Sequence, residues 1–534
     1  MPSPGISADH RNILGNTGQN VLGLGVYAFA IVVAQVLMTR VLGAGAYGVV
    51  AQATQFAFIA AAATRFGMDV ANVRLVAILA GRNEAARARG LVRRSAIVAV
   101  SVSVVFALVV FLAAGWIART FSPLGGTARL SFEAAAIGIP LGALAFTYMG
   151  ATRGLKIMRF TLYGQWIAQP ILWIVFAVGG WILVGPAGPL SGRVGVKVGA
   201  TTLAFSASWG VALVIAWYGW RKLSRPFGHA MEGEGIPEER MGALLRFGAL
   251  RAPATLFSQL IFFTDMYVLG WLWSGMGARG AAQVGIYNAT LRVGQSLFLF
   301  LTSVSLTFSP FVADLHHRRE IGRLDGLYKT VTRWTLAATI PLLLILAILP
   351  GEVLRIFGKE FVAGAPAMRM LIIGMIVPVM VGTVGFILIM VGRTGWDLLV
   401  YMGGFAIDIG VALVLARPES LGMRGAAIAQ ACTLSFSAVA RLLLVRHFVQ
   451  IWPFNRQFLR LAAPTIVAAV TIAGVHAVLP AQKWLVNLAG SALAGMVVYG
   501  LLVLAMGLTH TERRTLAGAV RRLTARDGSA PVAG

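Results

Sequence analysis

Apolar segments long enough to cross a lipid bilayer follow one another along almost the whole chain, separated by short connections rich in glycine, proline and basic residues. A helix that spans a bilayer needs about 20 consecutive apolar residues, whereas a strand of an outer-membrane barrel needs only about ten of alternating character. The length and continuity of these segments therefore predict an all-α polytopic membrane protein.

The polar connections divide the apolar sequence into about fourteen expected spans. The spans lie near residues 18–40, 48–66, 93–115, 132–152, 160–184, 198–221, 248–274, 283–312, 329–350, 366–391, 397–416, 424–446, 458–479 and 484–508. Because this number is even, both termini are expected on the same side of the membrane.

Composition supports this interpretation and adds an orientation. The chain is 58% hydrophobic and 12% charged, with a mean hydropathy of +0.80 and a net charge of +26. Most basic residues lie in the C-terminal tail and in alternate connections, at 82–94, 153–159, 221–226, 316–323 and 446–460. Basic loops stay in the cytoplasm, so both termini are expected there. Since the basic residues border membrane spans, their excess does not indicate nucleic-acid binding.

Two weak similarities indicate an internal repeat. Gly48 in GAYGVVAQATQ corresponds to Gly285 in AQVGIYNATLR, 237 positions later, and Arg153 in GATRG corresponds to Arg393 in VGRTG, 240 positions later. Six spans per repeat is an even number, so the halves are expected to be related by an axis along the membrane normal.

The repeat and the long polar connection after the sixth span predict the domain organisation. We expect an N-terminal six-helix lobe (1–225), a cytoplasmic linker (226–245), a pseudo-symmetric C-terminal six-helix lobe (246–447), two extra helices (448–512) and a basic cytoplasmic tail (513–534).

An ordered set of short motifs gives the chain a family resemblance over roughly residues 12–446. The motifs are RVLGAGAYG (40–48), LLRFGALRAPATL (244–256), FFTDMYVLG (262–270), VGIYNATLRVGQ (284–295), FSPFVADL (308–315), VLRIFGKEF (353–361) and GMRGAAIAQ (422–430). In these the chain resembles the polysaccharide and lipid-linked oligosaccharide flippases, such as those of O-antigen, within the superfamily that includes multidrug/cation antiporters and the peptidoglycan lipid II flippase.

The resemblance implies a transporter of the bacterial cytoplasmic membrane that flips a polyprenyl-diphosphate-linked oligosaccharide by alternating access, for surface polysaccharide or lipopolysaccharide synthesis. Membrane lipids, a glycan polymerase and glycosyltransferases are the expected partners. The sequence has no Walker loop, nucleophile elbow or zinc helix motif, so we expect no enzyme activity, no ATP site and no cofactor, and transport driven by a proton or sodium gradient.

Two other functions are considered. A drug/cation antiporter of this superfamily usually has twelve spans and an acidic residue in the first, whereas residues 18–39 hold no acid. A membrane glycosyltransferase or polymerase would need catalytic residues in a large outer loop, and no outer connection is long enough.

The break between the first two expected spans, at 38–50, combines Arg40, Gly43, Gly48 and Tyr47. Glycine permits a tight turn, a tyrosine suits the headgroup level, and an arginine can extend outward to the interface. We therefore expect a structural hairpin at the outer mouth that works as a gate or hinge; substrate contact is the alternative. Gly285, Arg153 and Arg393 are the other expected gate or hinge residues.

Charged residues inside the spans are candidate site residues, because an ion in the bilayer must face water or a partner. Arginine forms a bidentate fork for phosphate oxygens, and polar side chains suit sugar hydroxyls. We assign Arg251 and Arg292 to the diphosphate, with Arg65 and Arg74 as helpers. The candidates for the sugar are Gln259, Asp265, Tyr287, Asn288 and Gln295.

For several of these residues a structural role is the alternative. Asp265 could neutralise a neighbouring arginine, and Arg65 and Arg74 could anchor span ends at the interface. Arg153 and Arg393 could bind anionic headgroups. Glu133 and Asp408 also lie inside spans, without an assigned role. No cluster of residues has metal-ligand spacing, so no metal site is expected.

Overall fold

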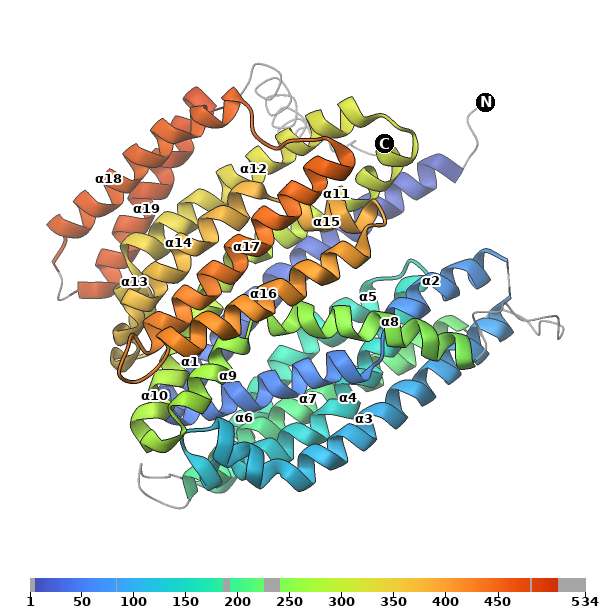
Figure 1. Cartoon of the computed structure of the whole chain (residues 1–534), viewed down its shortest axis with the longest axis horizontal. Coiled ribbons are helices and arrows are strands. Elements are labelled where there is room, and N and C mark those ends of the chain that lie inside the picture. Colours follow the sequence, from blue (N-terminus) through green and yellow to red (C-terminus); the bar gives the residue numbers. More distant parts are fainter. Residues whose placement is uncertain (1–4, 83, 186–192, 225–240, 481–482, 508–534) are drawn as a thin grey trace, which may run out of the picture.

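The structure is a computed structural model that describes residues 5–82, 84–185, 193–224, 241–480 and 483–507, and it is helical throughout, with no strand in these ranges (Figure 1). Its helices are α1 (Gly5–Thr64), α2 (Met68–Gly81), α3 (Ala85–Phe121), α4 (Arg129–Gly154), α5 (Arg159–Thr161), α6 (Gln169–Val184), α7 (Arg193–Ser224), α8 (Met241–Leu260), α9 (Thr264–Leu272), α10 (Gly277–Gln295), α11 (Leu297–His317), α12 (Ile321–Ile348), α13 (Pro350–Arg355), α14 (Ala365–Val381), α15 (Val384–Met390), α16 (Thr394–Leu415), α17 (Met423–Val449), α18 (Ala462–Val478) and α19 (Trp484–Leu502).

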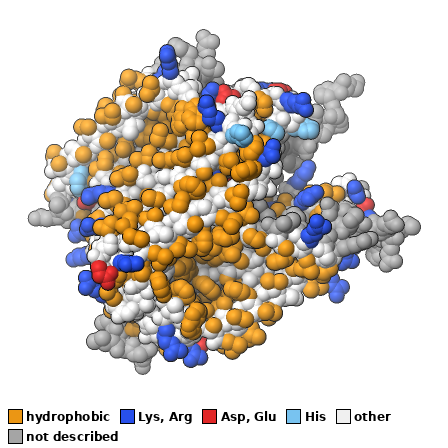
Figure 2. Space-filling model, in the orientation of Figure 1, with side chains coloured by type: hydrophobic (Ala, Val, Ile, Leu, Met, Phe, Trp, Pro, Cys, Tyr) orange, Lys and Arg blue, Asp and Glu red, His pale blue; other side chains and the backbone are white. Residues whose placement is uncertain are grey.

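The all-α prediction is confirmed, and the described residues of every expected apolar segment lie mostly in one or two helices. The count of fourteen is not confirmed, because 11 helices of the described residues are long and apolar enough to span a bilayer, or 12 if the bent pair α8–α9 is one span. One reason is that the first two expected spans form a single element, α1. Figure 2 shows hydrophobic side chains across the middle of the visible face and basic side chains toward its margins, as a bilayer requires.

The helices form two groups (Figure 1). In one, α4 packs against α3 and α7, and α6 packs against α7; in the other, α17 packs against α14 and α16, and α12 packs against α14. The groups diverge toward the end that carries the turn between α11 and α12, which we call the basic end. At the opposite end α1 packs against α10 and joins them.

Two elements depart from a simple division into lobes. Helix α8 follows the predicted linker, yet it packs against α1 and α2 as well as α16. The pair α18–α19 packs on the outer side of α12, where the Tyr499 hydroxyl donates to the carbonyl of Ala337 at 2.9 Å. Most of the predicted linker (226–245) and all of the predicted tail (513–534) lie outside the described residues, so the domain boundaries remain predictions.

The expected turn between the first two spans is a break within α1. At Gly43 the backbone has φ 75° and ψ 168°, and this non-helical residue separates two helical stretches. Glycine adopts this conformation readily because it has no Cβ. In Figure 1 the ribbon of α1 runs away from the N-terminus and turns back at this break. Tyr47 is buried within the protein, since it is only 3% exposed and its hydroxyl donates to Asn288 Oδ1 at 3.0 Å; its position at the headgroup level stays a prediction.

The second stretch of α1 meets α10 through the two glycines that the repeat equates. A Cβ placed on Gly48 would lie 2.7 Å from the carbonyl oxygen of Ala281 and 2.8 Å from the backbone nitrogen of Gly285. Residues that occupy the same position in two repeats touch each other only at a pseudo-twofold axis. The contact therefore supports an axis between α1 and α10, and it requires glycine on both helices.

We predict that Gly48→Ala lowers the melting temperature of the purified protein, because overpacking against backbone costs about 1–3 kcal/mol. The matched control is Gly410→Ala, since Gly410 lies inside α16 with open space around it. Alanine normally favours a helix over glycine, so the control should be neutral or stabilising. Equal melting temperatures for the two variants, measured by thermal unfolding in detergent, would contradict a tight α1–α10 contact.

Candidate functional site

Arg292 is the predicted site residue with the most informative surroundings. It lies in the last turn of α10, half-buried, with its guanidinium carbon 5.2 Å from the centroid of the Phe263 ring. Its Nη2 donates to the side-chain oxygen of Gln55 in α1. Among the described residues no carboxylate pairs with Arg292, so this arginine carries an uncompensated positive charge at a junction of the two helix groups.

Gln55 is a site residue that the sequence reasoning missed. It precedes Arg292 by the same 237 positions that separate Gly48 from Gly285, so the repeat equates glutamine with arginine at this position. Gln55 is 3% exposed, and its side-chain nitrogen has no hydrogen-bond partner among the described residues. The offset of 237 positions between Gly48 and Gly285, applied to Arg292, would have identified Gln55.

The bend between α8 and α9 lies beside Arg292. The two helices meet at 60°, and the interruption frees backbone groups that a continuous helix would pair. Gln430 of α17 donates to the carbonyl of Ile261 at 3.1 Å, and Gln295 of α10 donates to the carbonyl of Phe262 at 3.3 Å. Broken helices of this kind occur within a membrane only where protein or water satisfies the freed groups.

A buried pair of carboxylates lies at the start of α9. The backbone N–H of Asp265 donates to Oδ2 of Asp408 in α16 at 3.2 Å, so Asp408 binds a helix N-terminus, where negative charge is favoured. The Tyr287 hydroxyl donates to the carboxylate of Asp265, and Oδ1 of Asp408 has no hydrogen-bond partner among the described residues. Both aspartates are fully buried.

Asp265 does not form the ion pair with an arginine that was its alternative role. Within the described part of the chain, no basic side chain pairs with Asp265 or Asp408. Two carboxylates this close cannot both stay ionised in an apolar interior without a compensating charge. The arrangement can therefore hold a proton or a small cation. From the sequence, Asp408 could be identified only as an acid inside a span, because the sequence does not indicate which other helix it faces.

The other residues predicted to contact sugar have protein partners in this conformation or lie beside the bend. Asn288 is 1% exposed and accepts from Tyr47, and Tyr287 is fully buried against Asp265. Gln259 is half-buried in the last turn of α8. Arg251 lies in α8, but its side chain is outside the part of the chain that the structure describes.

The N-terminal group holds a second basic cluster near the basic end. Arg65 forms an ion pair with Asp69 at 3.2 Å and lies over the Phe146 ring at 4.6 Å. Arg153, at the end of α4, is half-buried and donates to the carbonyl of Met149 at 3.3 Å. Arg74 is exposed on α2. Arg65 lies in the turn between α1 and α2, Arg74 on α2 and Arg153 on α4, whereas Arg292 lies on α10.

The break in α1 is held by reciprocal contacts with the segment that follows α12. Arg40 donates from Nε to the carbonyl of Ile356 at 3.0 Å and from Nη2 to that of Arg355 at 3.1 Å, at the C-terminal end of α13. In return, Oε1 of Glu360 accepts from the backbone N–H of Ala44 at 2.7 Å, at the start of the second stretch of α1. A cation at a helix C-terminus and an anion at a helix N-terminus are both stabilising. We call these contacts the α1 clamp.

Together these contacts connect the two helix groups at one end and leave them apart at the basic end, where the outline in Figure 2 is notched. An uncompensated guanidinium, a broken helix and a buried acidic pair lie next to each other at α1, α8, α9, α10 and α16. Such a site can bind an anionic group and a cation by non-covalent contacts.

Comparison with solved structures identifies the fold. A lipid II flippase, MurJ, in an inward closed conformation matches with a TM-score of 0.68 and 14% identity, over 91% of this chain and 96% of that chain. A multidrug resistance MATE family transporter in an inward-facing conformation matches with a TM-score of 0.56 and 16% identity, over 80% of this chain and 94% of that chain. A MATE structure in the bent conformation has a TM-score of 0.58 and 15% identity, over 83% and 95%.

These similarities show a shared fold, and the proteins that carry it are flippases and transporters rather than enzymes. No curated protein matched the sequence. The model of one protein family, described as polysaccharide biosynthesis protein, matches residues 13–316, more than half of the chain and much of the region that carries the motifs. The chain therefore belongs to the polysaccharide biosynthesis protein family of multi-pass membrane proteins.

Proposed function

We propose that this protein flips a polyprenyl-diphosphate-linked oligosaccharide from the cytoplasmic to the outer leaflet of the bacterial cytoplasmic membrane, by alternating access and without ATP. Family membership and the flippase-like fold support transport of a lipid-linked substrate for surface polysaccharide synthesis. Surface glycans such as O-antigen are the proposed destination, and glycosyltransferases and a polymerase are the proposed partners.

The observation that carries the proposal is the uncompensated charge of Arg292 at a junction of the two helix groups. A guanidinium in the membrane without a carboxylate partner is unfavourable unless it meets water or an anion. A diphosphate supplies that anion with geometry that suits the planar fork of arginine. Arg251, nine residues before the end of α8 at the bend, is proposed as the second diphosphate ligand.

The same charge distinguishes the proposal from a drug/cation antiporter. A cationic drug would be repelled by Arg292, and the acidic residues Asp265 and Asp408 are fully buried against each other. We therefore assign this acidic pair to coupling rather than to the substrate. A proton or sodium ion bound between the carboxylates removes their repulsion. Loss of that ion restores the repulsion, which in this proposal outweighs the attraction of Asp408 to the N-terminus of α9 and displaces it.

The α1 clamp is proposed to close the outer end while substrate enters from the cytoplasm. Its contacts join α1 to the segment after α13, so the outer end opens only when Arg40 and Glu360 separate from their backbone partners. Gly43 lies between Arg40 and Ala44, the two clamp residues of α1, and provides the backbone freedom for the change in helix direction. The basic end would then face the cytoplasm.

The function is tested by replacing the arginines. In cells that lack the native gene, Arg292→Ala and Arg251→Ala are expected to reduce surface glycan at least about tenfold, since a charged hydrogen bond contributes about 1.5–3 kcal/mol. The lipid-linked precursor should accumulate on the cytoplasmic leaflet. Arg417→Ala is the control, because Arg417 is exposed just after α16 and its Nε donates to the carbonyl of Leu413 at the end of that helix. Normal surface glycan in both variants, present at normal levels in the membrane, would refute the site assignment.

Coupling is tested with amide variants. Asp265→Asn and Asp408→Asn are expected to keep or raise the melting temperature, because they remove repulsion between buried carboxylates. Transport by proteoliposomes should lose its dependence on a proton or sodium gradient. The control is Glu133→Gln, which removes an acid paired with exposed Arg129. A gradient dependence that stays intact in both aspartate variants would show that coupling lies elsewhere.

The clamp is tested by labelling from the outside. In a Cys432→Ser background, Ala281→Cys places a thiol in the buried contact between α1 and α10. Adding Glu360→Ala should increase its reaction with an impermeant maleimide several-fold, because the outer end opens more often. Glu419→Ala removes an exposed acid near the turn between α16 and α17 and should have no effect. Unchanged labelling in the Glu360 variant would exclude a closing role for the clamp.

A further inference from the structure

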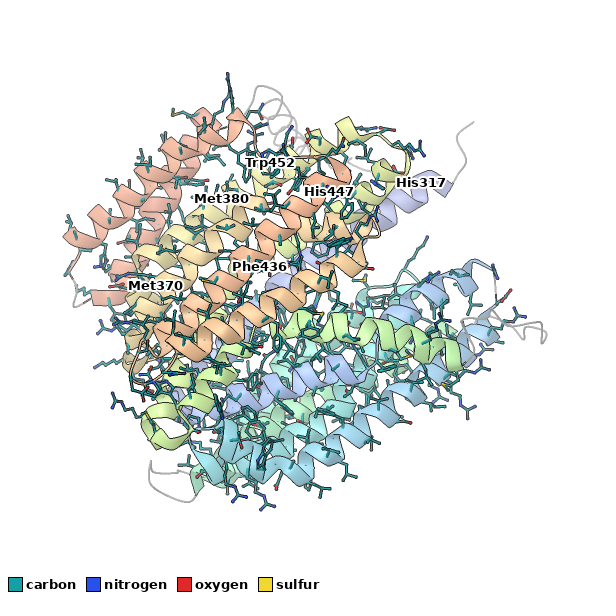
Figure 3. All side chains as sticks on the ribbon, viewed as in Figure 1. His317, Met370, Met380, Phe436, His447 and Trp452 are labelled. Carbon is teal, nitrogen blue, oxygen red and sulfur yellow. The ribbon has the colours of Figure 1, made fainter. Side chains whose placement is uncertain are left out.

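An aromatic and basic surface at the basic end of the C-terminal helix group has no part in the proposed transport site. Its rings come from the start of α16, the end of α17 and the segment after it. Figure 3 shows His447 and Trp452 at the same end of the molecule as His317. We call this surface the aromatic shelf and define it by Trp396, Phe448, Trp452, Phe454 and Phe458.

The shelf rings form two packed sets, one between α16 and α17 and one in the segment after α17. Trp396 and Phe448 have centroids 5.8 Å apart, and the rings of Phe454 and Trp452 are 5.7 Å apart. Phe454 also packs edge to face on Phe458 at 5.5 Å. Trp396 is 46% exposed and Leu459, next to Phe458, is 73% exposed, so the outer side of the shelf faces the surroundings. Exposed rings at span ends are typical of the membrane interface.

Two arginines lie on this surface, each over an aromatic ring. The guanidinium carbon of Arg393 is 4.4 Å from the Phe448 centroid, and that of Arg446 is 4.9 Å from the Trp452 centroid. A guanidinium stacked on a ring keeps the N–H groups at its edge free for an anion. Both arginines are exposed, and within the described residues neither forms an ion pair.

The acids closest to the shelf are already occupied. Asp325 of α12 pairs with Lys329 and accepts from the backbone N–H of Trp452 at 3.1 Å, which fixes the segment after α17 to α12. Asp397 forms a buried ion pair with Arg441 at 2.7 Å. The charge of Arg393 and Arg446 is therefore not neutralised by these carboxylates, and the shelf surface is positive.

We propose that the aromatic shelf binds the phosphate of an anionic phospholipid headgroup. Arg393 and Arg446 would contact the phosphate oxygens, and the rings and Leu459 would lie among the glycerol and upper acyl carbons. The position at span ends favours a resident membrane lipid over the transported substrate, whose diphosphate we assign to Arg292. This site would attach the turn between α15 and α16 and the end of α17 to the interface, and thereby hold the C-terminal group while the other group moves.

The test is native mass spectrometry of the full-length protein in detergent, titrated with phosphatidylglycerol or with zwitterionic phosphatidylethanolamine. The wild type should bind phosphatidylglycerol more tightly. Arg393→Gln and Arg446→Gln should each weaken that binding about fivefold, because a basic residue near an anionic lipid contributes about 1 kcal/mol. The double variant should lose about 25-fold.

The matched control is Arg318→Gln with Arg323→Gln, which removes the same charge at the same end from arginines paired with Asp314 and Glu320. It should bind phosphatidylglycerol like the wild type. Phe448→Leu with Trp452→Leu keeps the charge and removes the rings, so an intermediate loss is expected if the rings position the arginines. Normal melting temperatures show that the variants are folded.

A third titration, with farnesyl diphosphate, distinguishes the lipid site from the transport site. Its binding should fall in Arg292→Ala and stay unchanged in the Arg393 and Arg446 double variant. The proposal is overturned if the double variant binds phosphatidylglycerol like the wild type, if the control loses as much, or if the double variant loses farnesyl diphosphate instead. None of these outcomes depends on whether the protein flips an oligosaccharide.

Discussion

The close approach of α1 and α10 at Gly48 and Gly285 is the constraint on which the rest of the structure depends. Two backbones touch there without intervening side chains, so the helices on either side are held at one end and diverge at the other. The contact also brings Gln55 of α1 to Arg292 of α10, seven residues further along both helices. The position of the charged site is therefore a consequence of the packing of two glycines.

The bend between α8 and α9 determines the position of the acidic pair, Asp265 and Asp408. A continuous helix would pair its own backbone groups, and the bend leaves the N–H of Asp265 and the carbonyls of Ile261 and Phe262 to be satisfied by Asp408, Gln430 and Gln295. Three helices thus converge on one interruption. In the proposed coupling, a change in the ionisation of one carboxylate would act directly on a helix end and so link an ion gradient to a movement of the backbone.

Much of this architecture follows from the sequence, because membrane helices must be long, apolar and bordered by basic connections. The helical class and the positions of the apolar segments were predictable, and the repeat offset had drawn attention to Gly48 and Gly285, which the structure places in contact. The partners of in-span charges were not, since hydropathy places Asp265 and Asp408 in separate spans and gives no information on which faces meet. Burial was also unpredictable from residue type: nothing in the sequence around Tyr47 indicates that its side chain packs in the protein core, where its hydroxyl meets Asn288 of α10.

Gly43 has a consequence for how substitutions there would act. A residue with a Cβ would be strained at φ 75° but not in a regular helix, so its free-energy cost would fall on the folded-back arrangement of α1 alone. If alternating access, as proposed, includes a state in which α1 is straight, such a replacement would favour that state over the folded-back one.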